Sequence, residues 1–275
     1  MMADVKMIGP IPQIGYGTWN RPDQECYDGV IAALEAGYRH IDTAEGYNNE
    51  EFVGKALKDS GVSRGDYFLT TKVAPESFGP GQIRPHVEAS LEKLGVDKVD
   101  LLLLHYPSIN DEYDIEDYMA QFAAVFDAGL TKHIGVSNFT KHYLDRALEL
   151  LGDRSLLTNQ VEAHVFMQNH PIVEYTRAKG ISVTAYSPLA RGAVTDDAVI
   201  AGVAAKHGAT NGQIALAFLM HEGHVVIPSS GNPKRIAENL AAKDVELDGE
   251  DMTKLRGLER GMRLVNGPWC PTWDE

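Results

Sequence analysis

Four side chains in the first half of the sequence have the types and positions that proton transfer requires. Asp42, Lys72 and His105 each end a short apolar run, and Tyr47 follows Asp42 after one turn of loop. The C-terminal ends of parallel strands in a barrel share one face, so these four side chains are expected to converge there. An acid, an amine, an imidazole and a phenol gathered at one end of a barrel predict acid–base catalysis.

A tyrosine needs assistance to act as an acid near neutral pH, because its ordinary pKa is about 10. A neighbouring ammonium lowers that pKa, and a carboxylate beside the ammonium keeps it charged and oriented. We therefore predict that Tyr47 is the proton donor, that Lys72 tunes it and that Asp42 anchors Lys72. His105 would orient a substrate oxygen or assist the proton transfer. Taken singly, each residue type is more often structural, and only their joint placement favours function.

The rest of the sequence alternates apolar runs with amphipathic segments. We predict strands at residues 38–42, 68–72, 101–105, 133–136, 157–162, 182–186 and 225–227, with an eighth at 241–245. Helices are predicted at residues 23–36, 85–94, 118–126, 141–151, 171–179, 198–207, 213–221 and 235–240. Strands that alternate with helices form parallel sheets, and about eight repeats favour closure into a (β/α)8 TIM barrel.

No linker divides the sequence, so we expect one α/β domain over residues 1–275. Residues 8–14 are expected to form a short hairpin that plugs the barrel floor. The C-terminal tail is expected near the active-site mouth, where Trp269 and Trp273 would either fold over the pocket or only stabilise the barrel.

The composition argues against several classes of partner. The 275 residues include 25 Lys and Arg against 39 Asp and Glu, a net charge of −14. Nucleic acids and anionic membranes are recognised by clustered cations, so neither is an expected partner. The first residues lack the basic and apolar regions of a signal peptide, and no apolar run is long enough to cross a membrane. Cys26 and Cys270 show no disulfide or metal spacing, so the cytoplasm is the default location.

Two common kinds of site are absent from the sequence pattern. Residues 15–20 contain two glycines but lack the third glycine and the following helix of a Rossmann nucleotide-binding motif. The ten histidines are scattered, and His164 and His170 do not lie four residues apart on one helix. We therefore predict neither a Rossmann fold nor a metal site.

Residues 42–57, DTAEGYNNEEFVGKAL, resemble the signature of the aldo-keto reductases nearly residue for residue. Further matches are IGVSNF at residues 134–139, NQVE at 159–162, AYSPL at 185–189 and VIPSS at 226–230. The resemblance implies a barrel that binds a nicotinamide cofactor without a Rossmann fold and reduces carbonyls to alcohols.

The resemblance also implies roles for individual residues. Tyr47 would be the general acid, tuned by Lys72 and Asp42, while His105 orients the carbonyl. Ser137, Asn138 and Gln160 would bind the nicotinamide carboxamide, Tyr186 would stack on the ring, and Thr18, Asp42, Ser187 and Leu189 would also contact the cofactor. Without the resemblance, these polar residues would be assigned to loops and Tyr186 to packing.

The segment of residues 227–239 resembles the clasp that holds the cofactor's adenosine phosphate. Ser230, Asn232 and Arg235 are donors there, and Glu238 and Asn239 match positions that contact the adenine. Many family members carry Lys where this chain has Ser229, and that lysine normally pairs with the 2′-phosphate. Its absence weakens the case for a strict NADPH preference, but Ser230, Asn232 and Arg235 remain as donors, and a guanidinium can bind phosphate through two hydrogen bonds. We therefore predict NADPH as the preferred cofactor, with NADH tolerated.

Clues to the substrate are fewer. Trp19 would line the pocket beside the nicotinamide, and Tyr106 occupies a position where many relatives have Trp. The tail resembles those of compact bacterial members that reduce diketo-gluconates and methylglyoxal. A small polar aldehyde or ketone is the expected substrate, such as a dicarbonyl, a keto sugar or a keto acid.

Two other hypotheses about the function are compatible with a barrel that carries these residues. A barrel that binds nicotinamide could be a non-catalytic cofactor-sensing subunit, although an intact tetrad favours catalysis. A lyase or isomerase could instead use Lys72 as a Schiff-base nucleophile, with no cofactor requirement. The family resemblance suggests a monomer.

Overall fold

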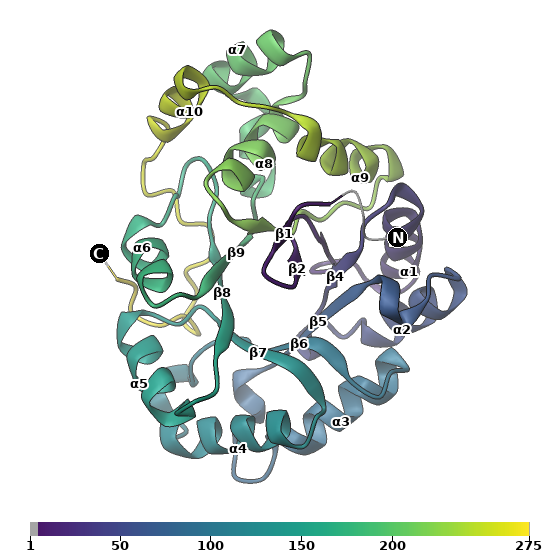
Figure 1. The fold of residues 1–275 in the computed structure, drawn as a ribbon, viewed down its shortest axis with the longest axis vertical. Coiled ribbons are helices and arrows are strands. Elements are labelled where there is room, and N and C mark those ends of the chain that lie inside the picture. The colour runs from purple at the N-terminus through teal and green to yellow at the C-terminus, as the bar shows by residue number, and fades with distance from the viewer. Residues whose placement is uncertain (1–4, 275) are drawn as a thin grey trace.

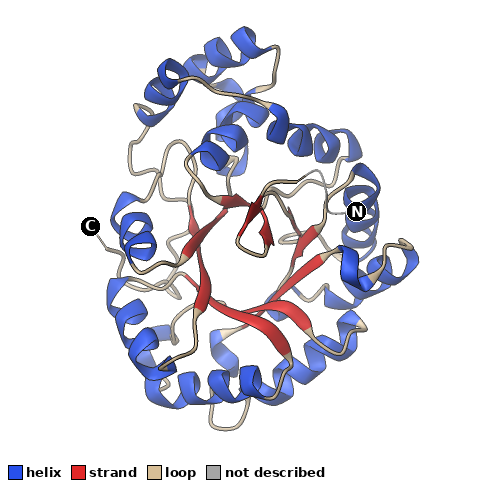
Figure 2. Cartoon of the chain, in the orientation of Figure 1, coloured by secondary structure: helices blue, strands red, loops and turns tan. Residues whose placement is uncertain are grey.

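The computed structural model describes residues 5–274 and shows a ring of parallel strands enclosed by helices (Figures 1 and 2). The eight strands follow one another around the ring in chain order, each hydrogen-bonded to the next. They are β3 (Tyr16–Gly17), β4 (His40–Asp42), β5 (Phe68–Val73), β6 (Val99–Leu104), β7 (Thr131–Ser137), β8 (Leu156–Glu162), β9 (Ser182–Tyr186) and β10 (Val225–Val226). The predicted (β/α)8 barrel is confirmed.

The ring closes through short strands at the two ends of the sheet. Val226 N–H donates to Gln13 O and Gly15 N–H to Val226 O, each over 2.8 Å, and Gly17 N–H donates to Pro228 O over 3.0 Å. Gly17 leaves room for this contact, since a Cβ there would lie 2.9 Å from the backbone oxygen of Ile227. The last strand therefore meets the first.

An antiparallel hairpin of β1 (Met7–Ile8) and β2 (Ile11–Pro12) lies at the centre of the ring in Figure 1. Ile11 is fully buried and belongs to a separate apolar cluster with Phe68, Leu101, Leu103 and Val225. Phe68 and Val225 are the first residues of their strands. The hairpin therefore closes the N-terminal end of the barrel, as the sequence predicted.

Helices cover the outside of the ring (Figure 2). They are α1 (Asp23–Ala36), α2 (Glu50–Asp59), α3 (Ile83–Leu94), α4 (Ile115–Asp127), α5 (Lys141–Leu151), α6 (His170–Ala178), α7 (Ala198–His207), α8 (Asn211–His221), α9 (Pro233–Leu240) and α10 (Gly249–Arg256). The eight predicted helices are present, with ends shifted by a few residues. The helices α2 and α10 were not predicted.

One strand prediction is wrong. Residues 241–244 form a 3-10 helix instead of the expected eighth strand, because α9 continues into a tight turn at its C-terminal end. The missing strand is β3, whose two residues are too few to show a periodic pattern. Within residues 5–274, no helix combines the length and apolar character needed to cross a membrane.

Candidate active site

A cavity of about 1340 Å³ opens at the C-terminal ends of the strands. Its lining includes all four residues predicted to contact substrate, which are Trp19, Tyr47, His105 and Tyr106. It also includes every residue predicted to contact the cofactor except Thr18, namely Asp42, Ser137, Asn138, Gln160, Tyr186, Ser187, Leu189, Ser229, Ser230, Asn232, Arg235, Glu238 and Asn239. Thr18 is fully buried, and its hydroxyl donates to the backbone oxygen of Asp42.

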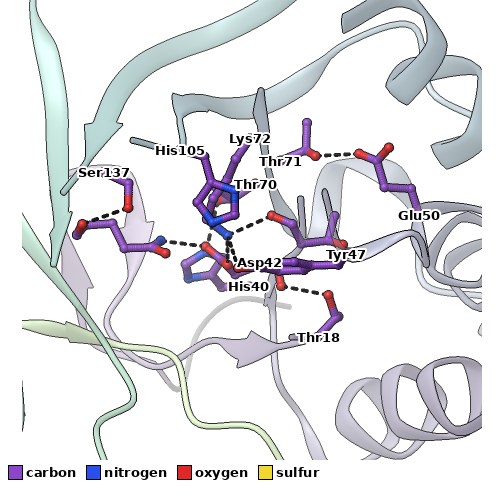
Figure 3. Close-up of polar contacts among 12 residues, drawn as sticks. Thr18, His40, Asp42, Tyr47, Glu50, Thr70, Thr71, Lys72, His105 and Ser137 are labelled. Carbon is purple, nitrogen blue, oxygen red and sulfur yellow. Dashed lines mark hydrogen bonds and ion pairs between the residues drawn. The ribbon is translucent and has the colours of Figure 1, made fainter. Parts of the chain in front are cut away.

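Lys72 is the centre of the polar network shown in Figure 3. It lies on β5, is fully buried, and its Nζ donates to the carboxylate of Asp42 at the end of β4. The same nitrogen donates to Thr43 O over 2.8 Å and to the Tyr47 hydroxyl over 3.2 Å. With these three partners all donors of the ammonium are used. The structure therefore joins Asp42, Lys72 and Tyr47 in the order that the sequence predicted.

Asp42 is held from a second side. Its Oδ2 accepts a hydrogen bond of 2.8 Å from Nε2 of Gln160, and its side chain is almost completely buried. A buried carboxylate is stable as an anion only when its charge is neutralised and its lone pairs are bonded. Lys72 and Gln160 supply both conditions, so the carboxylate is fixed in position.

Burial and charge act in opposite directions on the two titratable groups of this network. Burial lowers the pKa of Lys72, but Asp42 and Tyr47 raise it more, so that its pKa lies above the ordinary value. Burial raises the pKa of Tyr47, and Lys72 lowers it by less, so the net pKa is above 10.0. Lys72 thus acts on Tyr47 in the predicted direction, but burial outweighs it. At neutral pH the site holds an ammonium and a protonated phenol.

His105 follows β6 and stands beside the phenol. The ring centroids of His105 and Tyr47 are 5.5 Å apart, in an edge-on arrangement. Burial lowers the pKa of His105 well below 6.5, and the charge of Lys72 lowers it further. The imidazole is therefore neutral at pH 7 and can donate one hydrogen bond to a substrate oxygen.

A second polar network lies across the cavity, at the ends of β7 and β9. Asn138 adopts a left-handed backbone conformation with φ 62°, which asparagine tolerates well. Its Nδ2 donates to Ser137 Oγ and to His105 O, both over 3.0 Å, and its Oδ1 accepts from the Tyr186 hydroxyl over 2.8 Å. These bonds fix the amide of Asn138 and the ring of Tyr186 as a wall of the cavity.

The C-terminal tail reaches the cavity through a buried carboxylate at the end of β8. Glu162 is fully buried and accepts hydrogen bonds from the backbone N–H groups of Leu264 (2.7 Å) and Val265 (2.8 Å). Val265 and Trp269 line the cavity, and Trp269 is 47% exposed. Trp269 therefore borders the pocket, which supports the first of the two roles considered for the tail. Trp273, which was expected to fold over the pocket with it, is not among the lining residues and donates instead to Asn266 Oδ1 over 2.9 Å.

The geometry agrees poorly with a Schiff-base lysine. Such a nucleophile must be reachable and deprotonated, whereas Lys72 is fully buried, uses all its donors and has a raised pKa. Among residues 5–274, no three His, Cys, Asp or Glu side chains cluster in a way that could hold a metal ion.

Comparison with known proteins decides the family. Residues 13–260 match the model of the aldo/keto reductase family. The chain is an aldo-keto reductase. It is 41% identical over 265 residues to a methylglyoxal reductase DkgB of Salmonella typhimurium, covering 96% of this chain and 99% of the relative.

Solved structures agree with this assignment. The aldose reductase of Schistosoma japonicum is 34% identical with a TM-score of 0.88, covering 93% of this chain and 91% of that protein. A proposed 2,5-diketo-D-gluconic acid reductase B is 36% identical with a TM-score of 0.93, covering 96% of this chain and 94% of that one. This aldo-keto reductase is thus a carbonyl oxidoreductase with a nicotinamide cofactor.

The residues present fit such a cofactor. The cavity runs without interruption from Tyr47 and His105, past Asn138 and Tyr186, to the donors beyond β10. A nicotinamide would meet the Asn138–Tyr186 wall, and an adenosine phosphate would meet Ser229, Ser230, Asn232 and Arg235. The side-chain oxygen of Asn232 accepts the N–H of Lys234 at the start of α9, which leaves its amide hydrogens for a ligand.

Sequence reasoning missed several residues of this aldo-keto reductase's cavity. Arg21 and Arg191 both line it, and the Arg191 guanidinium lies 5.2 Å from the Trp19 ring centroid. Arg21 follows Trp19 by two residues, so its presence in the same loop was the available signal. Nothing in the local sequence indicated that Glu162 holds the tail.

Proposed function

We propose that this protein reduces small aldehydes and ketones to alcohols with NADPH as the preferred cofactor and NADH tolerated. The contact of 3.2 Å between the buried Lys72 Nζ and the hydroxyl of Tyr47, which lines the cavity, carries the proposal. A phenol that faces an open cavity and rests on a buried ammonium is a proton donor whose anion is stabilised.

The carbonyl oxygen of the substrate binds between the Tyr47 hydroxyl and the neutral ring of His105. As negative charge develops on that oxygen, His105 donates a hydrogen bond and Tyr47 transfers its proton. Lys72 lies against the resulting phenolate and stabilises it, while Asp42 keeps Lys72 charged. A bound nicotinamide supplies the hydride.

The Asn138–Tyr186 wall sets the face from which the hydride comes. Ser137, Asn138 and Gln160 are proposed to hold the carboxamide. Asp42 takes one of the two amide hydrogens of Gln160, which leaves the second hydrogen and the amide oxygen for the cofactor. Because Gln160 contacts both groups, cofactor placement and the position of Asp42 are coupled. Orientation of this kind contributes several kcal/mol to catalysis.

A small polar dicarbonyl is the proposed substrate class. Trp19, Tyr106 and Trp269 give the substrate end an aromatic lining, and Arg191 adds a cation beside Trp19. The relatives named above are a methylglyoxal reductase and a proposed diketo-gluconic acid reductase. The substrates in both names are small carbonyl compounds that carry a second oxygen-containing group beside the carbonyl.

The test is NADPH oxidation followed by absorbance with methylglyoxal and a panel of small diketones. Tyr47→Phe should lower kcat by about two to four orders of magnitude, the usual contribution of a positioned acid. Its affinity for NADPH should stay near that of the wild type. Tyr27→Phe is the matched control, because the Tyr27 hydroxyl bonds only to Asp59 on the surface.

Normal turnover in Tyr47→Phe would show that another group donates the proton. A wild-type protein that binds NADPH but reduces no carbonyl in the panel would contradict the proposed substrate class.

A further inference from the structure

We propose that Arg21 supplies a second cation to the 2′-phosphate site, beside Arg235, and that Glu25, which pairs with Arg21, sets the preference between NADPH and NADH. This inference rests on the proposed function. It answers the question that Ser229 raises, namely which group takes the place of the lysine that many family members carry there.

Arg21 reaches Ser229 from the opposite end of the chain. Its Nε donates to the Ser229 hydroxyl over 3.2 Å, across a sequence separation of 208 residues. Both residues line the cavity. The guanidinium is therefore positioned at the side chain of residue 229, where a lysine would otherwise place its ammonium.

The loop that carries Arg21 is held rigidly. Nδ2 of Asn49, a buried residue, donates to Arg21 O and to Thr18 O, both over 2.9 Å. The Asn49 oxygen in turn accepts from the Thr43 hydroxyl over 3.1 Å, next to the Lys72 network. The backbone that presents Arg21 is thus ordered before any ligand binds, which reduces the entropy lost on binding.

Glu25 shares the guanidinium. Its Oε1 lies 2.5 Å from Nη1 of Arg21, which is four residues earlier in the sequence. The side chain of Glu25 is 44% exposed and that of Arg21 is 24% exposed. The pair packs against the loop after β10, because a Cβ on Gly231 would meet Glu25 Oε1 at 2.1 Å. Arg21 still has donors that bond to neither Ser229 nor Glu25.

These contacts predict opposite effects of the two residues. A 2′-phosphate carries between one and two negative charges, accepts strongly from a guanidinium and is repelled by a carboxylate. Arg21 should therefore favour NADPH and Glu25 should oppose it. NADH has only a hydroxyl at that position, so Glu25 lowers the affinity for NADH little. Glu25 therefore reduces the preference for NADPH that Arg21 creates.

The inference is tested by calorimetric titration of the whole protein with adenosine 2′,5′-bisphosphate and with AMP, which differ in the 2′-phosphate. Arg21→Ala should weaken binding of the bisphosphate by about tenfold, the contribution of a charge-assisted hydrogen bond, and that of AMP by less than about twofold. Glu25→Gln should tighten the bisphosphate by about threefold. NADPH and NADH should follow the same pattern.

The chain offers a matched control and a rescue. Arg84 and Glu88 form an exposed pair with the same spacing, away from the cavity, so Arg84→Ala and Glu88→Gln should change neither affinity. Adding Ser229→Lys to Arg21→Ala should restore the bisphosphate affinity, because it returns a cation to the same place.

Equal weakening of bisphosphate and AMP by Arg21→Ala, or no weakening of either, would overturn the inference while leaving the proposed function intact. A wild-type protein that binds no NADPH at all would instead refute the proposed function, and this inference with it.

Discussion

The buried pair of Asp42 and Lys72 makes a prediction about stability that does not depend on substrate or cofactor. Asp42→Asn removes the carboxylate that is bonded to the fully buried ammonium of Lys72. Removing one partner of a buried ion pair costs about 3–5 kcal/mol, since the remaining charge is left without compensation. Lys72→Met should cost a similar amount, because Asp42 then keeps only its bond from Gln160.

The double variant, Asp42→Asn with Lys72→Met, should lose no more stability than either single variant, since no uncompensated charge remains. The measurement is denaturant unfolding by circular dichroism, extrapolated to water with equal slopes for all variants. Asp127→Asn on the exposed pair with Arg154 is the control and should leave the unfolding free energy nearly unchanged.

The same variants also test the pKa argument. Without Asp42, burial is the dominant influence on Lys72, so its pKa should fall below the value in an unfolded chain. The loss of unfolding free energy in Asp42→Asn should then diminish as pH rises, because a neutral amine is buried at a lower free-energy cost than an ammonium. Strict additivity of the two single losses, at any pH, would refute the reasoning that the two charges act as a pair.

Two further predictions concern residues outside the proton-transfer site. Burial lowers the pKa of His224 to about 3, so between pH 6.5 and pH 4 only the unfolded chain binds this proton. Stability should fall with acidity in that window, and His224→Gln should make the slope shallower by about 1.4 kcal/mol per pH unit in denaturant titrations; exposed His142→Asn should not. Glu162→Gln should leave one tail N–H unpaired, raising KM for the carbonyl about tenfold while the cofactor Kd stays constant. Unchanged hydrogen exchange at Leu264 and Val265 would contradict the second prediction.

The sequence predicted much of the barrel because its central strands are long apolar runs with one polar side chain at the end. Asp42 and Lys72 were expected to meet for that reason, and they do. The strand β3 could not be predicted, because Tyr16 and Gly17 are paired through backbone groups at both edges and carry no pattern of their own.

The parts of the site that escaped prediction depend on distances in space alone. Arg21 and Ser229 are far apart in sequence, and each is an ordinary loop residue until the barrel closes. Glu162 was assigned only to a strand end, although its burial beneath the tail gives it a structural task. The direction of the Tyr47 pKa was also missed, since the extent of burial around a side chain is not visible in its neighbours along the chain.

The closing seam of the barrel has a consequence for how the protein is made. Until β10 exists, β3 and β9 are open strand edges, which are templates for wrong pairing. The backbone bonds of Gly15 and Gly17 to Val226 and Pro228 end this state. The side-chain contacts beside them, from Tyr16 to Ser230 and from Arg21 to Ser229, join residues 214 and 208 positions apart. Non-local contacts of this kind form late, because chain entropy must be lost before they contribute. During synthesis the loop that carries Arg21 is therefore made long before Ser229, its partner in the loop after β10. A growing chain is most exposed to aggregation just before the barrel closes.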